Sequence, residues 1–361
     1  MAIRISPDIA GIVPYSPGKP IEEVEREHGI TGSIKLASNE NPRGPSPKAL
    51  AVLSDAAKTV NRYPDGGGYY LRDALAERWK VTPDQIVLGN GSDEVIGLLT
   101  KAFLEPEDEA VMADPSFVIY KIDVTAVHAK PVLVPLKDHR HDLPAMAKAV
   151  TPRTRLVFVC NPNNPTGTYA TAAEVRAFMQ AIPPDVIVVF DEAYYEYVTA
   201  ADYPDTMALL KAGRNVALLR TFSKIYGLAG LRIGYGLTTP EIVQYLNRIR
   251  PPFNTNSLAQ KAALAALADE EHVRESRRLN IEGMAYLTER LSALGLTVVP
   301  SQANFLYFDV KQDGKAVFEA LLRQGVIVRH LGGPFLRVTI GLPHENERFI
   351  AALQAVLPHK R

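Results

Sequence analysis

The chain has 361 residues, of which 47% are hydrophobic and 22% charged, a balance that excludes a disordered chain and indicates two packed domains. Its 40 basic residues match its 40 acidic residues, so no excess charge points to a nucleic acid partner, and small-molecule chemistry is the better expectation. The single cysteine, Cys160, excludes an intrachain disulfide and predicts a reducing, cytoplasmic compartment.

Four prolines in the first twenty residues predict an extended or turn-like arm. The same prolines interrupt every apolar run before it reaches the length of a secretory signal, and the apolar runs elsewhere have only the length of strands. We therefore expect neither a signal peptide nor a membrane span. The first longer helix is expected over IEEVEREHG, residues 21–29.

Short apolar runs alternate with helix-length amphipathic segments between about residues 86 and 240, a pattern typical of a parallel sheet covered by helices on both faces. The clearest strands are nearly continuous apolar runs, namely IVLG (86–89), LVFVC (156–160), VIVVF (186–190) and VALLR (216–220). A polar cluster follows each run. Because ligands of open parallel sheets bind beyond the carboxyl ends of the strands, we expect these clusters to share one pocket.

The pattern changes after residue 250, where PPFNTNS breaks the chain. Two amphipathic helices are expected over residues 257–270 and 273–295. Short strands with turn signals between them follow within 297–310, 325–331 and 336–342, and a terminal helix spans 345–356. The predicted fold class is therefore α/β, with a large, mostly parallel sheet domain covered by helices and a smaller α+β domain.

The polar clusters meet the four demands of pyridoxal 5'-phosphate (PLP), which are a lysine for a Schiff base, a carboxylate for the pyridine nitrogen, donors for the phenolate oxygen and an anion site for the phosphate. Lys224 follows a buried strand, so its amine would leave the sheet at the edge of the pocket. Desolvation there lowers the pKa of a lysine and makes it nucleophilic. A lone lysine after a strand is more often a surface charge, and it is the neighbouring clusters that favour the catalytic interpretation.

Asp191 follows VIVVF, and a carboxylate at the end of a buried strand needs a cationic or hydrogen-bonded partner. A protonated pyridine nitrogen would be such a partner, whereas a helix cap or a Mg²⁺ ligand is the alternative for this residue taken alone. Tyr194 and Asn164 offer donors for the phenolate oxygen. Phe117 could stack on the ring, or could be an ordinary core residue.

Two segments offer groups for the phosphate. Ser223 and Arg232 flank Lys224 and supply a hydroxyl and a planar guanidinium, both suited to a dianion. Gly91 and Ser92 open SDEVIGLLTKAF, which reads as a helix with Asp93 near its cap. Free backbone N–H groups at such a helix N-terminus favour an anion.

Taken together, CNPNNPTG, DEAYYEY and TFSKIYGLAGLRIGY are similar in order and spacing to the PLP-dependent aminotransferases of the aspartate aminotransferase fold. PYSPGKPIEEVEREHG, KLASNENPRGPSP, RYPDGGGYYLRDALAE and LRVTIG resemble the histidinol-phosphate aminotransferase family, so the resemblance extends across almost the whole chain. It implies a large PLP-binding domain over residues 46–250 and a small domain formed by 1–45 and 251–361. It also implies a homodimer whose subunits complete each other's active sites, with no metal.

The resemblance carries the same cofactor roles for the residues above, with Lys224 also moving protons and the backbone at Ser92 and Asp93 holding the phosphate. It adds Tyr63, in the RYPD motif, as a residue that reaches the phosphate from the other subunit. For the substrate, it implies Arg337 as the clamp of an α-carboxylate, and Arg329 together with Arg337 for a substrate phosphate. The other residues implied near the substrate are Tyr15 and Asn39.

The implied reaction moves an amino group between glutamate and imidazole acetol phosphate, and its product is histidinol phosphate. Two alternatives use the same cofactor site: an aromatic aminotransferase acting on phenylalanine or tyrosine, and a phosphothreonine decarboxylase. A third alternative is a nucleotide-binding module that uses GNGS as a phosphate loop. The chain lacks the G-x-x-x-x-G-K-[ST] motif that such a loop requires.

Overall fold

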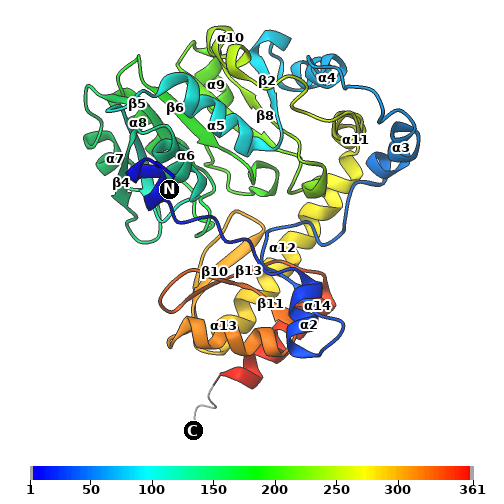
Figure 1. Ribbon diagram of the computed structural model, residues 1–361. Coiled ribbons are helices and arrows are strands. Elements are labelled where there is room, and N and C mark those ends of the chain that lie inside the picture. Colours follow the sequence, from blue (N-terminus) through cyan, green and yellow to red (C-terminus); the bar gives the residue numbers. More distant parts are fainter. Residues whose placement is uncertain (1–2, 358–361) are drawn as a thin grey trace.

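The computed structural model describes residues 3–357. Figure 1 shows a larger body built on a seven-stranded sheet and a smaller body built on a four-stranded sheet, with the long helix α12 (Glu270–Ala293) running between them. Within the described residues, no helix is both long and apolar enough to cross a bilayer.

The seven-stranded sheet has the order β2-β8-β7-β6-β5-β3-β4. Only β8 runs antiparallel to its neighbours, so the other six strands share one direction. The four runs expected to be strands all lie in this sheet, and their carboxyl ends meet at one edge. The strands are β2 (Ile86–Gly89), β3 (Glu109–Asp114), β4 (Lys130–Pro135), β5 (Thr154–Cys160), β6 (Ile187–Asp191), β7 (Val216–Thr221) and β8 (Gly234–Leu237).

Helices cover both faces of this sheet, which explains why the central positions of its strands are almost continuously apolar. Val157 and Val159 of β5 pack into the core on one face, and Phe158 between them packs into the core on the other. One face carries α5 (Ser92–Phe103), α6 (Ile119–Ala126) and α10 (Pro240–Ile249). The other side carries α3 (Pro47–Ala57), α4 (Tyr69–Trp79), α7 (Leu143–Lys148), α8 (Ala172–Ala181), α9 (Thr206–Lys211) and α11 (Ser257–Leu267).

The smaller body contains an antiparallel sheet of β12 (Arg329–His330), β13 (Phe335–Thr339), β10 (Phe305–Asp309) and β9 (Thr297–Val299). Beside it, β1 (Ile34–Lys35) pairs in parallel with β11 (Val326–Ile327). This pairing brings a segment near the N-terminus into the C-terminal part of the fold. Three helices belong to the same body: α2 (Ile21–His28), α13 (Gly314–Arg323) and α14 (Pro343–Val356). The domain boundaries at residues 45 and 250 stay a prediction. The helix α11 follows residue 250 in the chain but packs into the core of the larger body.

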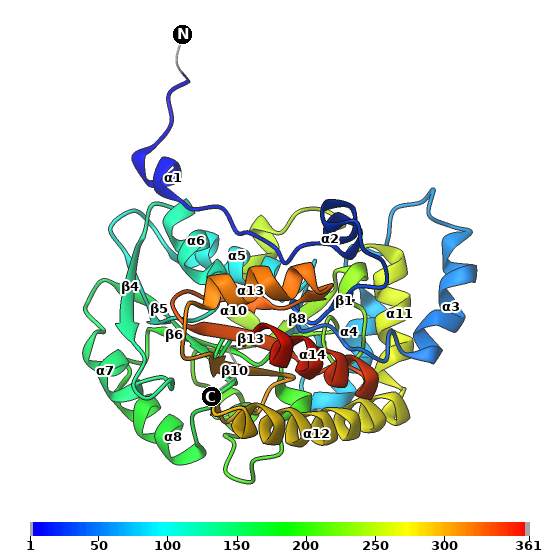
Figure 2. The same cartoon turned by 90° about the horizontal axis from the view of Figure 1, so that it is seen from below.

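The N-terminal arm contains a short helix, α1 (Pro7–Gly11), that the sequence did not predict. The expectation of an extended arm was wrong for these five residues, because Pro7 stands at the first helical position, where its fixed φ favours a helix. The Ser6 hydroxyl caps this helix by accepting from the Asp8 N–H. Figure 2 shows α1 beside α6 and the arm leading from there to α2 in the smaller body.

Candidate active site

The pocket lies between the two bodies at the carboxyl ends of β5, β6 and β7, and its volume is about 280 Å³. This is close to the lower end of the ~300–1,000 Å³ found for small-molecule sites. Twelve of the fourteen residues predicted for the site line the pocket. They are Tyr15, Asn39, Ser92, Asp93, Phe117, Asn164, Asp191, Tyr194, Ser223, Lys224, Arg232 and Arg337.

Lys224 follows β7, and its amine points into the pocket, where it donates a hydrogen bond to the Ser38 carbonyl at 3.2 Å. Burial, with a smaller contribution from the positive charge of Arg337, lowers the pKa of Lys224 to about 8. A larger fraction of the amine is therefore neutral near neutral pH than for an exposed lysine, and a neutral amine is the nucleophilic form.

Asp191 is the last residue of β6, and its carboxylate is buried at the floor of the pocket. Oδ1 accepts from the backbone N–H of Ala193 at 3.2 Å, and Oδ2 accepts from the hydroxyl of Tyr120 at 2.5 Å. Burial raises the pKa of Asp191 to about 6, against the effect of these two hydrogen bonds. A buried anion held in this way suits a cationic ring nitrogen, which would supply the missing counter-charge.

Asn164 and Tyr194, the two residues predicted to bind a phenolate oxygen, both line the pocket. The amide oxygen of Asn164 accepts from Arg337 Nη1 at 2.5 Å, so the amide nitrogen is left to donate. The Tyr194 hydroxyl accepts from Asn39 Nδ2 at 2.9 Å, so its own proton is free for another acceptor. The structure thus connects two predicted cofactor donors to two predicted substrate residues.

The end of the pocket that the sequence predicted to bind a phosphate is formed where α5 begins. Gly91 caps this helix with a φ of +82°, and a Cβ at this position would lie 2.5 Å from Arg232 Nη2. Only glycine therefore permits the Arg232 guanidinium to approach the helix N-terminus so closely. Arg232 Nη1 donates to the Ser223 hydroxyl at 3.5 Å, and Nη2 lies 3.7 Å from the Asp93 carboxylate. Backbone N–H groups, a hydroxyl and a guanidinium meet here, which is a donor set for a phosphate.

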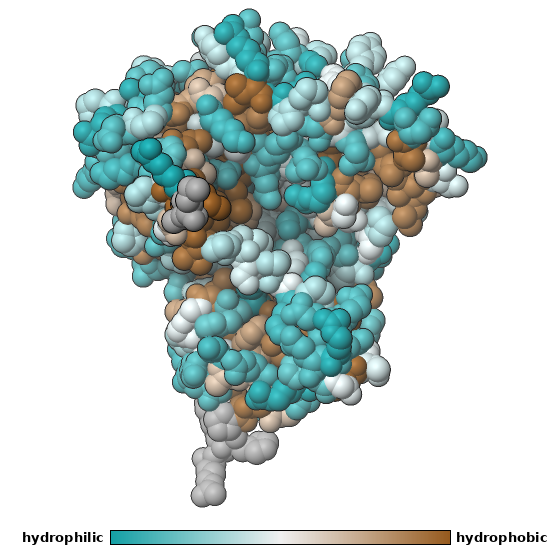
Figure 3. All heavy atoms as spheres, in the orientation of Figure 1, coloured by the Kyte–Doolittle hydropathy of each residue, from teal (hydrophilic) through white to brown (hydrophobic). Residues whose placement is uncertain are grey.

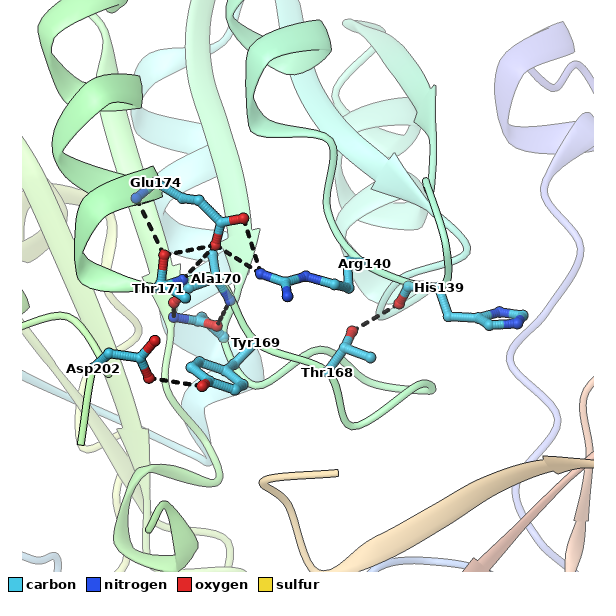
Figure 4. A network of polar contacts seen from close by, with 9 residues as sticks. His139, Arg140, Thr168, Tyr169, Ala170, Thr171, Glu174 and Asp202 are labelled. Carbon is cyan, nitrogen blue, oxygen red and sulfur yellow. Dashed lines mark hydrogen bonds and ion pairs between the residues drawn. The ribbon is translucent and has the colours of Figure 1, made fainter. Parts of the chain in front are cut away.

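The loop that carries Asn164 is held by contacts with the segment 139–141, part of which Figure 4 shows. Thr168 donates to the His139 carbonyl at 2.7 Å, and Arg140 pairs with Glu174 at the start of α8. Asn163 accepts from His141 Nε2 at 3.2 Å. Burial lowers the pKa of His141 to about 4, so this imidazole stays neutral while it supports the loop.

Phe117 lines the pocket from the segment between β3 and α6 and also packs against the core, so its stacking role stays a prediction. Sequence reasoning missed other lining residues, among them Ser38, Glu40 and Cys160. Ser38 and Glu40 flank Asn39 in the ASNENP segment, so that motif was the available signal. Tyr120 lies behind the pocket wall, and nothing in its sequence context pointed to Asp191.

Two predicted residues do not line the pocket. Arg329 lies at its mouth, where its guanidinium sits 5.6 Å above the Tyr15 ring and donates to the Ser16 carbonyl at 2.5 Å. Tyr63 is 82% exposed and stacks on Phe253 at the surface, with ring centroids 4.6 Å apart. It cannot reach the pocket of its own chain in this arrangement.

Comparison with known proteins places this geometry in a family. Residues 31–353 match the family model described as aminotransferase class I and II. The chain belongs to this family. It is 53% identical to a histidinol-phosphate aminotransferase of Moorella thermoacetica, over 97% of this chain and 92% of that protein. It is 50% identical to histidinol-phosphate aminotransferase 1 of Nitrosococcus oceani, over 98% and 96%.

A solved structure agrees with the sequence matches. The crystal structure of histidinol-phosphate aminotransferase from Sinorhizobium meliloti, in complex with pyridoxal-5'-phosphate, superposes with a TM-score of 0.91 at 30% identity. The match covers 99% of this chain and 99% of that one. The predicted fold class is therefore confirmed, and so is the predicted family.

Proposed function

We propose that this chain is a PLP-dependent transaminase that exchanges an amino group between glutamate and imidazole acetol phosphate. The observation that carries the proposal is the placement of Lys224 and Asp191 in one pocket beside the N-terminus of α5, in a chain of this family. The names of the relatives that share about half of its residues support the substrate. When bound, PLP supplies a protonated ring that withdraws electrons from the Cα of the substrate.

The predicted cofactor residues of the pocket each have a separate role in this proposal. Lys224 would hold the cofactor through its amine and would carry the proton to and from the substrate Cα, because its lowered pKa favours the neutral amine near neutral pH. Asp191 keeps the ring nitrogen protonated. Asn164 and Tyr194 donate to the ring oxygen, and the phosphate binds to the backbone at Ser92 and Asp93 and to two side chains, those of Ser223 and Arg232.

Two arginines, Arg337 and Arg329, would recognise the substrate. Arg337 is buried, and its Nε has no hydrogen-bond partner among the described residues. A buried guanidinium with an unpaired N–H is well suited to a carboxylate, which it would bind through two hydrogen bonds. Arg329 at the mouth, with Tyr15 and Asn39, would extend the site to a substrate phosphate.

Exchanging Arg337 for lysine is expected to raise KM for glutamate about tenfold, because lysine keeps the charge but cannot form the paired hydrogen bonds of a guanidinium. The matched variant is Arg329→Lys. It is expected to raise KM for histidinol phosphate and leave KM for glutamate close to that of the unmodified enzyme. Steady-state kinetics with each substrate separate the two roles, and equal effects of both variants on both substrates would contradict them.

A second subunit would complete the site. Tyr63 is exposed and does not line its own pocket, and apolar side chains are exposed on and just after α3, including Leu50 and Val60. Figure 3 shows this apolar patch at the edge formed by α3 and α11. We infer a homodimer in which the partner's tyrosine reaches the phosphate. Light scattering that gives the mass of one chain would exclude it.

The substrate is tested by measuring amino transfer from glutamate to imidazole acetol phosphate, and by comparing kcat/KM for histidinol phosphate with that for phenylalanine. The proposal expects histidinol phosphate to be preferred at least about tenfold, since Arg329 would bind its phosphate and phenylalanine has no phosphate to pair with this arginine. Preference for phenylalanine would make the chain an aromatic aminotransferase. Release of carbon dioxide from phosphothreonine without use of glutamate would make it a decarboxylase.

A further inference from the structure

Tyr120, in the first turn of α6, is fully buried directly behind the pocket wall. Its ring stacks on Phe158 of β5, with centroids 4.7 Å apart and planes within 9° of parallel. The same ring packs edge-to-face with the ring of Phe117, and the two ring centroids are 5.5 Å apart. Packing on two sides fixes the ring, so the direction of its hydroxyl group is fixed as well.

This hydroxyl donates to Asp191 Oδ2 at 2.5 Å. Among the described residues, the other hydrogen bond to this carboxylate comes from the backbone of Ala193 to Oδ1. An ionised carboxylate has about four acceptor positions, so one donor on each oxygen orients the group and leaves acceptor capacity facing the pocket. The backbone donor, Ala193, lies two residues after β6, and Tyr120 is the side chain among the described residues that holds the carboxylate by a hydrogen bond.

We propose that Tyr120 is a positioning residue that keeps the Asp191 carboxylate ionised and aimed at the protonated ring nitrogen of the cofactor. This inference rests on the proposed function, because it takes the ring nitrogen to be the partner of Asp191. In this proposal Tyr120 acts through Asp191 and contacts neither the cofactor nor the substrate.

The charges around Asp191 explain why a donor is needed. The titratable and charged groups that face it are Tyr120 of α6, Cys160 of β5, Asp93 of α5, Glu192 and Tyr194 after β6, and Lys224 across the pocket. Burial raises the pKa of Asp191, and the negative charges of Asp93 and Glu192 raise it further, whereas the Tyr120 hydrogen bond lowers it. Without this bond, the carboxyl group would keep its own proton at higher pH and could not act as the anionic hydrogen-bond acceptor for a protonated ring nitrogen.

The test compares Tyr120→Phe with Tyr235→Phe. Tyr235 is equally buried and its hydroxyl accepts from Trp79 Nε1 at 3.0 Å, so the control loses one buried hydrogen bond that does not involve Asp191. Cofactor-free protein is titrated with PLP at pH 6 and pH 8.5, and with an analogue in which carbon replaces the ring nitrogen. Binding is followed by visible absorbance, and melting temperatures establish that both variants are folded.

Tyr120→Phe is expected to bind PLP about tenfold more weakly than the unmodified chain at pH 6, as for loss of a hydrogen bond to a charged group. The difference should shrink at pH 8.5, where Asp191 ionises even without the phenol. The carbon analogue should bind with equal affinity to Tyr120→Phe and to the unmodified chain. Tyr235→Phe should bind PLP and the analogue with the affinity of the unmodified chain at both pH values.

Unchanged affinity of Tyr120→Phe for PLP at both pH values would overturn the proposal. An equal loss for PLP and the carbon analogue, independent of pH, would also overturn it, since that pattern reports packing alone. If the unmodified chain itself failed to bind PLP, the proposed function would fall first, and this result is distinct from the other two.

Discussion

Replacing Lys224 with alanine is expected to abolish the visible absorbance of the cofactor-bound protein and to lower turnover by roughly 10⁴-fold. Both effects have one cause, because the same amine binds the cofactor and moves the proton at the substrate Cα. The pocket offers no other lysine among its lining residues to take over either task. Absorbance spectra of the purified variant and single-turnover rates with glutamate measure the two effects separately.

Two further variants make this prediction sharper. Lys224→Arg keeps a positive charge but cannot form an imine, so it should lose the absorbance as completely as alanine does. Lys211→Ala removes an exposed lysine at the end of α9 and should change neither readout. A Lys224→Ala protein with normal turnover would show that this lysine is not the catalytic amine.

Asp191→Asn is expected to lower kcat by about 10²–10³-fold, the range found when one preorganised electrostatic partner is lost. A neutral amide cannot keep the ring nitrogen protonated, so the ring would withdraw electrons less well. Some cofactor should still bind, because Lys224 and the phosphate site are intact. Near-normal turnover would count against the assigned role.

The cofactor-free Asp191→Asn protein should show an effect of opposite sign. The pKa of Asp191 is raised to about 6 by burial, above the ~3.9 of an unfolded chain, so ionisation destabilises the native state. This cost is absent below the unfolded pKa, grows between pH 4 and 6, and is complete above pH 6. The variant should therefore gain on the order of 2 kcal/mol of stability relative to the unmodified protein between pH 4 and pH 8.

Denaturant unfolding of both cofactor-free proteins at pH 4 and pH 8 measures this gain. A stability difference that does not change with pH would show that the carboxylate is not strained by burial. A cationic partner would then do little to stabilise this carboxylate. The kcat and the unfolding free energy of Asp191→Asn together test whether Asp191 lowers stability while it raises activity.

Several of the predicted residues that line the pocket follow the carboxyl end of a parallel strand. Lys224, Asp191 and Asn164 each follow a continuous apolar run, and the direction of such strands brings their ends to one edge whatever the details of packing. Arg337 was placed by its motif, and the structure adds that its Nη1 contacts Asn164 from the other body. The arm helix α1 was missed because four prolines suggested only an extended chain.

What the sequence determined by itself was therefore the sheet, its edge and the chemistry of the residues along that edge, because strand direction and burial are local consequences of the residue pattern. Tertiary structure alone decided which groups meet across large separations: Tyr120 with Asp191, Asn39 with Tyr194, and the exposure of Tyr63. These contacts join different elements, so their distances depend on how helices pack on the sheet and how the two bodies lie together. No periodicity or spacing within one segment carries that information.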